Sequence, residues 1–196
     1  MKHWGLHVSN RVTLNNRKKH NTLNLKGQHK MKKLYFLRHA FAGQPEAPEV
    51  DDDRPLTKSG ISKMEKSAES IASIVKSFDV ILSSPLKRAH QTASIIAREM
   101  GYKDKIEYSD FLRPGAQIDK LMTSLAKYGR EEKQNVLLVG HEPDMSNIIS
   151  LLTGMPPGSI EFKKSAFCNI EVTSFSARAK GKLLWLLQPK LLRKIS

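Results

Sequence analysis

Short apolar runs alternate along this chain with longer segments whose apolar residues recur every three or four positions. The runs at residues 33–37, 79–84 and 135–141 predict strands, and residues 105–109 predict a further short strand. Between these runs the apolar side chains would gather on one face of a helix. Strands that alternate with helices favour a parallel sheet covered on both faces. We therefore expect an α/β fold, a three-layer α/β/α sandwich with a largely parallel, mixed central sheet.

The end of the chain departs from this alternation, which is why we expect the sheet to be mixed. Residues 166–172 and 182–187 are two more strand-like runs, and no helical pattern separates them. They predict a closing hairpin or a pair of edge strands.

Proline, serine and glycine predict where several helices begin and end. Pro85 suits the first position of a helix, with Ser84 as its N-cap. Gly129 is expected to stop the helix before the fourth strand. Pro143 is expected to open the helix after that strand, and Gly154 to end it.

The chain has 196 residues, enough for one domain with a substantial core. No apolar run approaches the roughly 18 to 20 residues that a membrane span needs. Cys168 is the single cysteine, which excludes an internal disulfide and a cysteine-rich zinc site. We expect no metal and no cofactor.

The positive charge is concentrated at the N-terminus. The net charge is +14, and residues 1–30 contribute seven basic residues and no acidic one. This segment has no hydrophobic periodicity, so we interpret it as a basic, disordered extension before a folded domain of residues 31–196. It lacks an apolar region of the secretory type, but a transit peptide stays open because acids are absent. We expect a cytoplasmic location, with organellar targeting by residues 1–30 as the alternative.

Basic side chains and histidines follow three of the predicted strands. Arg38 and His39 end the first strand, Arg88 lies at the start of the helix after the second, and His141 follows the fourth. The carboxyl ends of parallel strands meet at one edge of a sheet, so these four side chains should converge. With two helix N-termini they would form a cationic pocket suited to a phosphoryl group.

Each of these motifs alone has a simpler structural explanation, such as a solvated strand end or a capped helix. Their joint placement at parallel strand ends favours a function. An imidazole can act as a covalent nucleophile, so His39 could attack phosphorus while arginines hold the oxygens. The other nitrogen of His39 would then need an acceptor, for example a backbone carbonyl. We interpret His90, which also lies near Arg88, as an exposed helix residue.

These motifs resemble those of the histidine phosphatase superfamily. The stretch "LRHA" is similar to the first motif of that family, with Ala40 where the family has glycine. "SSPLKRAHQTA" resembles its second arginine motif, and "VGHEP" its second histidine motif. "DDRPLTKSG" and the tail "WLLQPKLL" are similar to the SixA-type phosphohistidine phosphatases. The resemblance covers the chain from about Lys33 to its end.

The resemblance implies roles for five residues. His39 would be the phosphorylated nucleophile, and Arg38, Arg88 and His141 would bind the phosphoryl group. His141 would also assist at the transition state, and Arg54 of the "RPLT" stretch would lean into the pocket or only anchor its loop.

The general acid found in many ester-cleaving relatives has no evident counterpart here. Arg113 and Pro114 stand near its expected place. Asp110 and Glu142 are the candidate substitutes, Glu142 because some acid-phosphatase relatives place an aspartate directly after the second histidine. A missing acid favours phosphohistidine, whose imidazole leaves readily, over alkyl phosphates.

The leading interpretation is thus a metal-independent phosphatase that works through a phosphohistidine intermediate, with a phosphohistidine protein as favoured substrate. The alternative within enzymes is a general or small-molecule phosphomonoesterase. The alternative of another class is a non-catalytic phosphate- or nucleic-acid-binding module, which the charge of +14 keeps open. We do not expect a membrane or nucleic-acid partner, because half of the excess charge lies in residues 1–30 and no basic platform with aromatics appears. The sequence does not indicate an oligomeric state.

Overall fold

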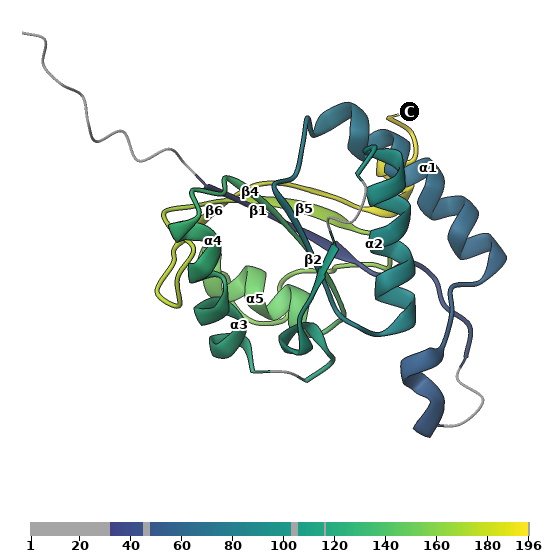
Figure 1. The fold of residues 1–196 in the computed structure, drawn as a ribbon, viewed down its shortest axis with the longest axis horizontal. Helices are drawn as coiled ribbons and strands as arrows, with labels where there is room; N and C mark the ends of the chain where they lie inside the picture. The colour runs from purple at the N-terminus through teal and green to yellow at the C-terminus, as the bar shows by residue number, and fades with distance from the viewer. Residues whose placement is uncertain (1–31, 45–47, 103–105, 116, 196) are drawn as a thin grey trace, which may run out of the picture.

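A computed structural model describes residues 32–44, 48–102, 106–115 and 117–195 of the chain (Figure 1). The predicted N-terminal extension lies outside these residues, so the boundary between it and the domain of residues 31–196 stays a prediction. Among the described helices, none combines the length and the apolar character that a bilayer span requires.

A single six-stranded sheet runs through the molecule in the order β3-β2-β4-β1-β5-β6. Pairing is parallel from β3 to β1, whereas β5 is antiparallel to both β1 and β6. The predicted largely parallel, mixed sheet with a closing hairpin is therefore confirmed. The strands are β1 (Lys32–Arg38), β2 (Val80–Ser83), β3 (Ile106–Tyr108), β4 (Asn135–Gly140), β5 (Phe167–Val172) and β6 (Gly181–Leu187).

Helices cover both faces of the sheet, as Figure 1 shows. One face carries α1 (Lys58–Ile74), α2 (Lys87–Glu99) and α6 (Pro189–Leu192). The other carries α3 (Ile118–Ser124), α4 (Ala126–Arg130) and α5 (Asp144–Thr153). Two short 3-10 helices, η1 (Pro48–Asp53) and η2 (Asp110–Leu112), lie in the connections.

Each face of the sheet has its own apolar core, and β1 contributes to both. Leu34 and Phe36 pack on the side of α3 to α5, while Tyr35 and Leu37 pack on the side of α1 and α2. All four side chains are buried. Burial of one such side chain stabilises the fold by roughly 1.5–3 kcal/mol. The strand that precedes Arg38 and His39 is therefore fixed from both sides.

The helix ends differ from the predictions at two places. Helix α2 begins at Lys87 after Leu86 as N-cap, so Pro85 lies before the helix and Ser84 does not cap it. The predicted helix from residue 118 onward breaks at Leu125 into α3 and α4, and Gly129 lies within α4 instead of ending it. Both differences shift a helix boundary by a few residues and leave the order of the elements as predicted.

The other predicted ends agree with the structure. Pro143 is the N-cap of α5, and Gly154 ends this helix in the left-handed conformation that glycine adopts without strain.

The loop after β1 is fastened to the start of α1. The Thr57 amide donates to the Phe41 carbonyl over 3.1 Å, and the Thr57 hydroxyl caps α1 by accepting from the Gly60 amide over 3.0 Å. Ala42 and Leu56 form an isolated bridge. A β-carbon on Gly60 would overlap the Phe41 carbonyl oxygen, so only glycine allows this approach.

Gly60→Ala should therefore lower the free energy of unfolding by about 1–3 kcal/mol, because the added methyl group must push the loop away from the helix. Denaturant unfolding measures this change. Gly43→Ala is the matched control: it lies in the same loop, and its β-carbon would have no neighbour closer than 4.0 Å. Equal stability of the two variants would contradict the close approach.

Candidate active site

Strand pairing brings the two histidines together at the carboxyl edge of the sheet. Arg38 ends β1 opposite Gly140 of β4, and the His39 amide donates to the Gly140 carbonyl over 3.0 Å. His141 directly follows Gly140, the last residue of β4, so it lies at the same edge as His39. The two imidazole rings lie with their centroids 5.0 Å apart and their planes inclined by 51°. Arg88 reaches the same pocket from the first turn of α2, where its charge acts on both histidines.

One hydrogen bond defines the state of the His39 ring. Its Nδ1 lies 2.7 Å from the Ala40 carbonyl oxygen. A carbonyl can only accept, so Nδ1 carries the proton and Nε2 keeps its lone pair. Burial, together with the positive charges of Arg88, Arg38 and Lys164, lowers the pKa of His39 to about 3, against the opposing effect of the Ala40 carbonyl. The ring is thus neutral at physiological pH.

The backbone around His39 is bonded at every amide. The Arg38 amide donates to the Ala166 carbonyl over 3.2 Å, and the Ala40 amide donates to Thr92 Oγ1 over 3.0 Å. Thr92 Oγ1 in turn donates to the Arg88 carbonyl over 2.7 Å. The end of β1 is therefore tied to α2, the helix that carries Arg88.

His141 contacts Ser84, the residue that the sequence predicted as a helix cap. Its Nε2 lies 2.9 Å from Ser84 Oγ, and the Leu86 amide donates to the same Oγ over 3.3 Å. Burial is the main reason why the pKa of His141 falls to about 2, followed by the charges of His39 and the nearby arginines. Its Nδ1 is buried and has no hydrogen-bond partner among the residues that the structure describes.

An aspartate that sequence reasoning missed links two arginines of the pocket. Asp51 of η1 pairs with Arg54 Nη2 over 2.8 Å and with Arg88 Nη2 over 2.9 Å, and its carbonyl accepts from Arg88 Nη1 over 2.8 Å. Arg54 Nη1 also donates to the Gly43 carbonyl over 3.0 Å. The run of three aspartates before Arg54 was the available signal.

Donors outnumber acceptors in this pocket. Arg38 gives Nη1 to the Phe162 carbonyl over 2.9 Å. The Nε atoms of Arg38, Arg54 and Arg88 are buried without an acceptor in the described parts of the chain. Unsatisfied buried donors and several cations favour an anionic guest that supplies oxygen acceptors.

The two candidate general acids are engaged elsewhere. The Glu142 carboxylate accepts from the Ser146 amide over 3.0 Å and from Ser146 Oγ over 2.7 Å, within the first turn of α5. The exposed Asp110 pairs with Arg113 Nε over 2.8 Å. Glu142 still acts on the site through its charge, which raises the pKa of Arg38 against the lowering by burial. Whether either residue donates a proton stays a prediction.

A lysine at the site was also missed. Lys164 precedes β5, and its neighbour Ser165 donates its amide to the carbonyls of Arg38 (3.1 Å) and His39 (3.3 Å). The Lys164 ammonium lies 4.5 Å from the centre of the Phe41 ring. Burial and the three pocket arginines lower its pKa. The only sequence signal was a pair of lysines before the hairpin.

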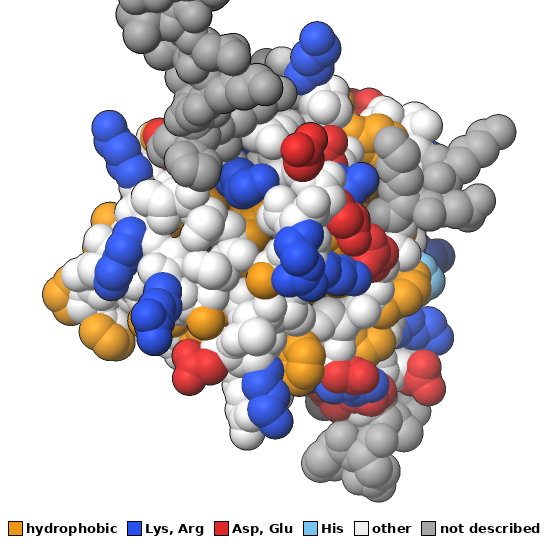
Figure 2. Space-filling view, turned by 60° about the vertical axis from the view of Figure 1, so that its left-hand side comes forward, with side chains coloured by type: hydrophobic (Ala, Val, Ile, Leu, Met, Phe, Trp, Pro, Cys, Tyr) orange, Lys and Arg blue, Asp and Glu red, His pale blue; other side chains and the backbone are white. Residues whose placement is uncertain are grey.

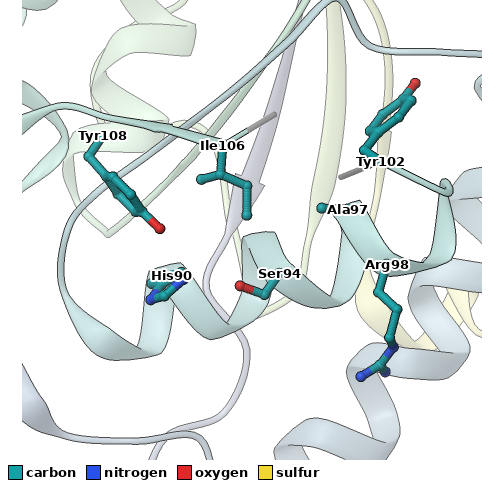
Figure 3. A pocket seen from close by; sticks show the side chains of 7 residues that line it. All are labelled: His90, Ser94, Ala97, Arg98, Tyr102, Ile106 and Tyr108. Carbon is teal, nitrogen blue, oxygen red and sulfur yellow. The ribbon is translucent and has the colours of Figure 1, made fainter. Parts of the chain in front are cut away.

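A separate pocket lies away from the two histidines and the arginines beside them. A pocket of about 550 Å³ separates α2 from β3 (Figure 3). His90, Ser94 and Arg98 line it from α2, with the exposed His90 ring edge-on to Tyr108 at 5.4 Å. None of the four converging residues lines it. Across the described residues there is also no group of three or more His, Cys, Asp or Glu side chains that could hold a metal ion.

The surface charge is dispersed in the view of Figure 2. Lys and Arg side chains are scattered over the face in view, and Asp and Glu side chains lie between them. On this face they do not form the continuous basic stripe that is typical of a nucleic-acid interface.

Comparison with known proteins relates the chain to phosphatases. The family model of the histidine phosphatase superfamily (branch 1) matches residues 34–114. An uncharacterised protein of Picosynechococcus sp. is 29% identical over 163 residues, which cover 81% of this chain and 98% of that protein. An uncharacterised chloroplastic protein of Arabidopsis thaliana is 27% identical, covering 81% of this chain and 78% of its own length.

Solved structures share the fold along nearly their whole length. The protein histidine phosphatase SixA, complexed with tungstate, superposes with a TM-score of 0.72 at 23% identity, covering 81% of this chain and 97% of that one. A protein of Agrobacterium tumefaciens assigned as phosphohistidine phosphatase SixA gives a TM-score of 0.67 at 28% identity, with 81% and 98% covered.

The lowered histidine pKa values predict an acid-sensitive stability. An unfolded histidine binds a proton below a pKa of about 6.5, whereas His39 and His141 stay neutral in the folded protein down to about 3 and 2. The unfolded state therefore binds more protons in this window, and the free energy of unfolding falls as pH drops from about 6.5 toward 3. Each histidine contributes up to about 1.4 kcal/mol per pH unit.

Denaturant unfolding between pH 7 and 4 measures this slope. His39→Gln and His141→Gln should each make it shallower. His90→Gln, which removes an exposed histidine, serves as the matched control. A slope in His39→Gln as steep as in the control would contradict the prediction.

Proposed function

We propose that this chain, which belongs to the histidine phosphatase superfamily and is a phosphatase, works through a covalent phosphohistidine intermediate on His39. The hydrogen bond from His39 Nδ1 to the Ala40 carbonyl carries the proposal. It holds the ring in the tautomer whose Nε2 lone pair is free, and the lowered pKa keeps that lone pair unprotonated.

The reaction has two displacements. In the first, His39 Nε2 forms a bond to phosphorus while the bond to the leaving group breaks, and the leaving group departs with the bonding electrons. The phosphorylated ring is then positively charged, and the Ala40 carbonyl faces its Nδ1 proton. In the second, a water oxygen bonds to phosphorus, the N–P bond breaks, and the ring recovers its lone pair. Both protons of the water leave on inorganic phosphate, as dihydrogen phosphate.

Arg38, Arg88 and His141 are proposed to bind the phosphoryl oxygens, with Arg54 at the edge of the pocket. Arg88 is held by Asp51 and Arg38 by the Phe162 carbonyl, so both guanidinium groups are positioned before substrate arrives. Fixed donors in a buried pocket stabilise charge that develops in the transition state. These side chains supply the charge neutralisation that metal ions provide in other phosphoryl transfers, so we propose a metal-independent reaction.

We propose a phosphohistidine protein as the substrate, as in SixA-type enzymes. The family membership and the 28% identity to the Agrobacterium tumefaciens protein support this class. Glu142 is bonded to Ser146, and Asp110 is paired with Arg113. Neither carboxyl group is therefore an evident proton donor for a poor leaving group, which also supports phosphohistidine as the substrate class.

For the location of the protein we keep the cytoplasm as the first proposal. The similarity to a chloroplastic protein of Arabidopsis thaliana supports the alternative that residues 1–30 direct the chain to an organelle.

His39→Ala should abolish turnover of an aryl phosphate without changing the circular dichroism spectrum, because the side chain ends a strand and does not build the core. The intermediate should be trapped on His39 by mass spectrometry at alkaline pH, since phosphoramidates are labile to acid. Turnover by the natural chain should survive a metal chelator. Near-normal activity of His39→Ala would refute the covalent mechanism.

The leaving group should decide the rate. General acid catalysis supplies ~10²–10⁴-fold, so an enzyme without it should favour leaving groups that need no proton. We expect a phosphohistidine peptide and activated aryl phosphates to react at least about a hundredfold faster in kcat/KM than phosphoserine or glycerol phosphate.

A series of aryl phosphates with rising leaving-group pKa tests the same dependence. We expect kcat/KM to fall steeply as the pKa of the leaving group rises. Glu142→Gln and Asp110→Asn are the paired tests for a hidden acid and should leave the slope unchanged. Comparable rates for phosphohistidine and alkyl phosphates would instead support the phosphomonoesterase alternative.

A further inference from the structure

A small basic cavity lies beside the loop that carries His39. Its volume is about 130 Å³, and its lining combines cations from three parts of the chain. Lys63 belongs to α1, Lys164 precedes β5, and Arg193 follows α6. Phe41 lines the cavity as well, and no acidic side chain does. Three cations around so small a space favour an anion.

The cavity lies beside the backbone that carries Arg38 and His39. Phe41 comes two residues after His39, and its carbonyl is fixed by the start of α1. Ser165, which also lines the cavity, donates its amide to the carbonyls of Arg38 and His39. The charge of Lys164 acts on His39 and on the arginines of the pocket. A group in the cavity would therefore lie next to a phosphoryl group held at His39.

The three cations have no carboxylate partner in the described parts of the chain. Among the described residues, no Asp or Glu oxygen lies within 4.0 Å of Lys63, Lys164 or Arg193. The neighbouring Lys163, by contrast, pairs with Glu161 over 3.2 Å and does not line the cavity. Lys164 is half-buried above the Phe41 ring, which holds its ammonium group in place without neutralising it.

We propose that this cavity is a second anion subsite, which binds a carboxylate that the substrate carries close to its phosphoryl group. The proposal rests on the proposed function, because it assumes that the phosphoryl group sits at His39. The volume corresponds to a few water molecules, which suits an acidic side chain. Phe41 in the lining offers apolar contact to the methylene groups of that side chain. The occupant is thus an Asp or Glu side chain near the phosphorylated residue of a protein substrate.

Matched substrates isolate the contribution of the carboxylate. The first pair is 3-carboxyphenyl phosphate and 3-carbamoylphenyl phosphate, which differ in one charge. The second is a set of phosphohistidine peptides with Glu or Gln at each of the three positions on either side. The measured quantity is the ratio of kcat/KM between the charged and the neutral partner, which cancels any general effect on catalysis.

For the natural chain the ratio should exceed about three for the peptide whose Glu reaches the cavity. It should fall toward one at high salt, where surface charges are screened. Lys164→Met, Lys63→Met and Arg193→Met should each lower the ratio, and Lys164→Arg should retain it. Lys66→Met, which removes an exposed lysine of α1 outside the cavity, is the matched control.

The outcomes separate this subsite from the proposed function. A ratio near one in both substrate sets, while turnover still depends on His39, would overturn the subsite and leave the mechanism standing. An equal drop in Lys66→Met and Lys164→Met would also overturn it, since general charge would then explain the preference. A preference shown by the aryl phosphates alone would overturn the protein substrate as the source of the carboxylate. Activity retained in His39→Ala would refute the proposed function itself.

Discussion

The parallel pairing of β1 with β4 is the constraint on which the site depends. It sets Arg38 opposite Gly140 and lets the His39 amide bond the Gly140 carbonyl, so the residues after both strands share one edge. Two histidines 102 positions apart thereby come within 5.0 Å, ring centre to ring centre. A shift of register by one residue would turn Leu34 and Phe36 into the opposite core and carry His39 away from His141. The apolar cores on both faces therefore also determine the chemistry.

Electrostatics then decide the protonation of the groups at that edge. Burial and four neighbouring cations keep His39 and His141 neutral, and Asp51 offsets part of the positive charge by bridging Arg54 and Arg88. The bridge also restrains two long side chains that would otherwise lose rotamer freedom when they bind an anion. The Ala40 carbonyl fixes the single proton of the neutral His39 ring on Nδ1, which leaves Nε2 unprotonated.

Much of this could be predicted from the sequence, because strand ends and periodicity are local signals. The α/β sandwich, the hairpin, the convergence of Arg38, His39, Arg88 and His141, and a carbonyl acceptor for His39 were all expected. Ser84 was misjudged: it was predicted as a helix cap, and instead its hydroxyl hydrogen-bonds His141 from the end of the neighbouring strand β2. Asp51 and Lys164 were missed because their positions depend on how two loops fold over the strand ends. Contacts of that kind leave no period or spacing in a single sequence.

The backbone around the proposed nucleophile, His39, is held on several sides. The amides of three consecutive residues are bonded to three separate parts of the chain: Arg38 to Ala166, His39 to Gly140 and Ala40 to Thr92. Exchange of the His39 amide therefore requires the end of β1 to separate from Gly140 of β4. On heating, the site should therefore lose its geometry only when the domain unfolds. The temperature at which activity is lost should then coincide with the temperature at which the domain melts.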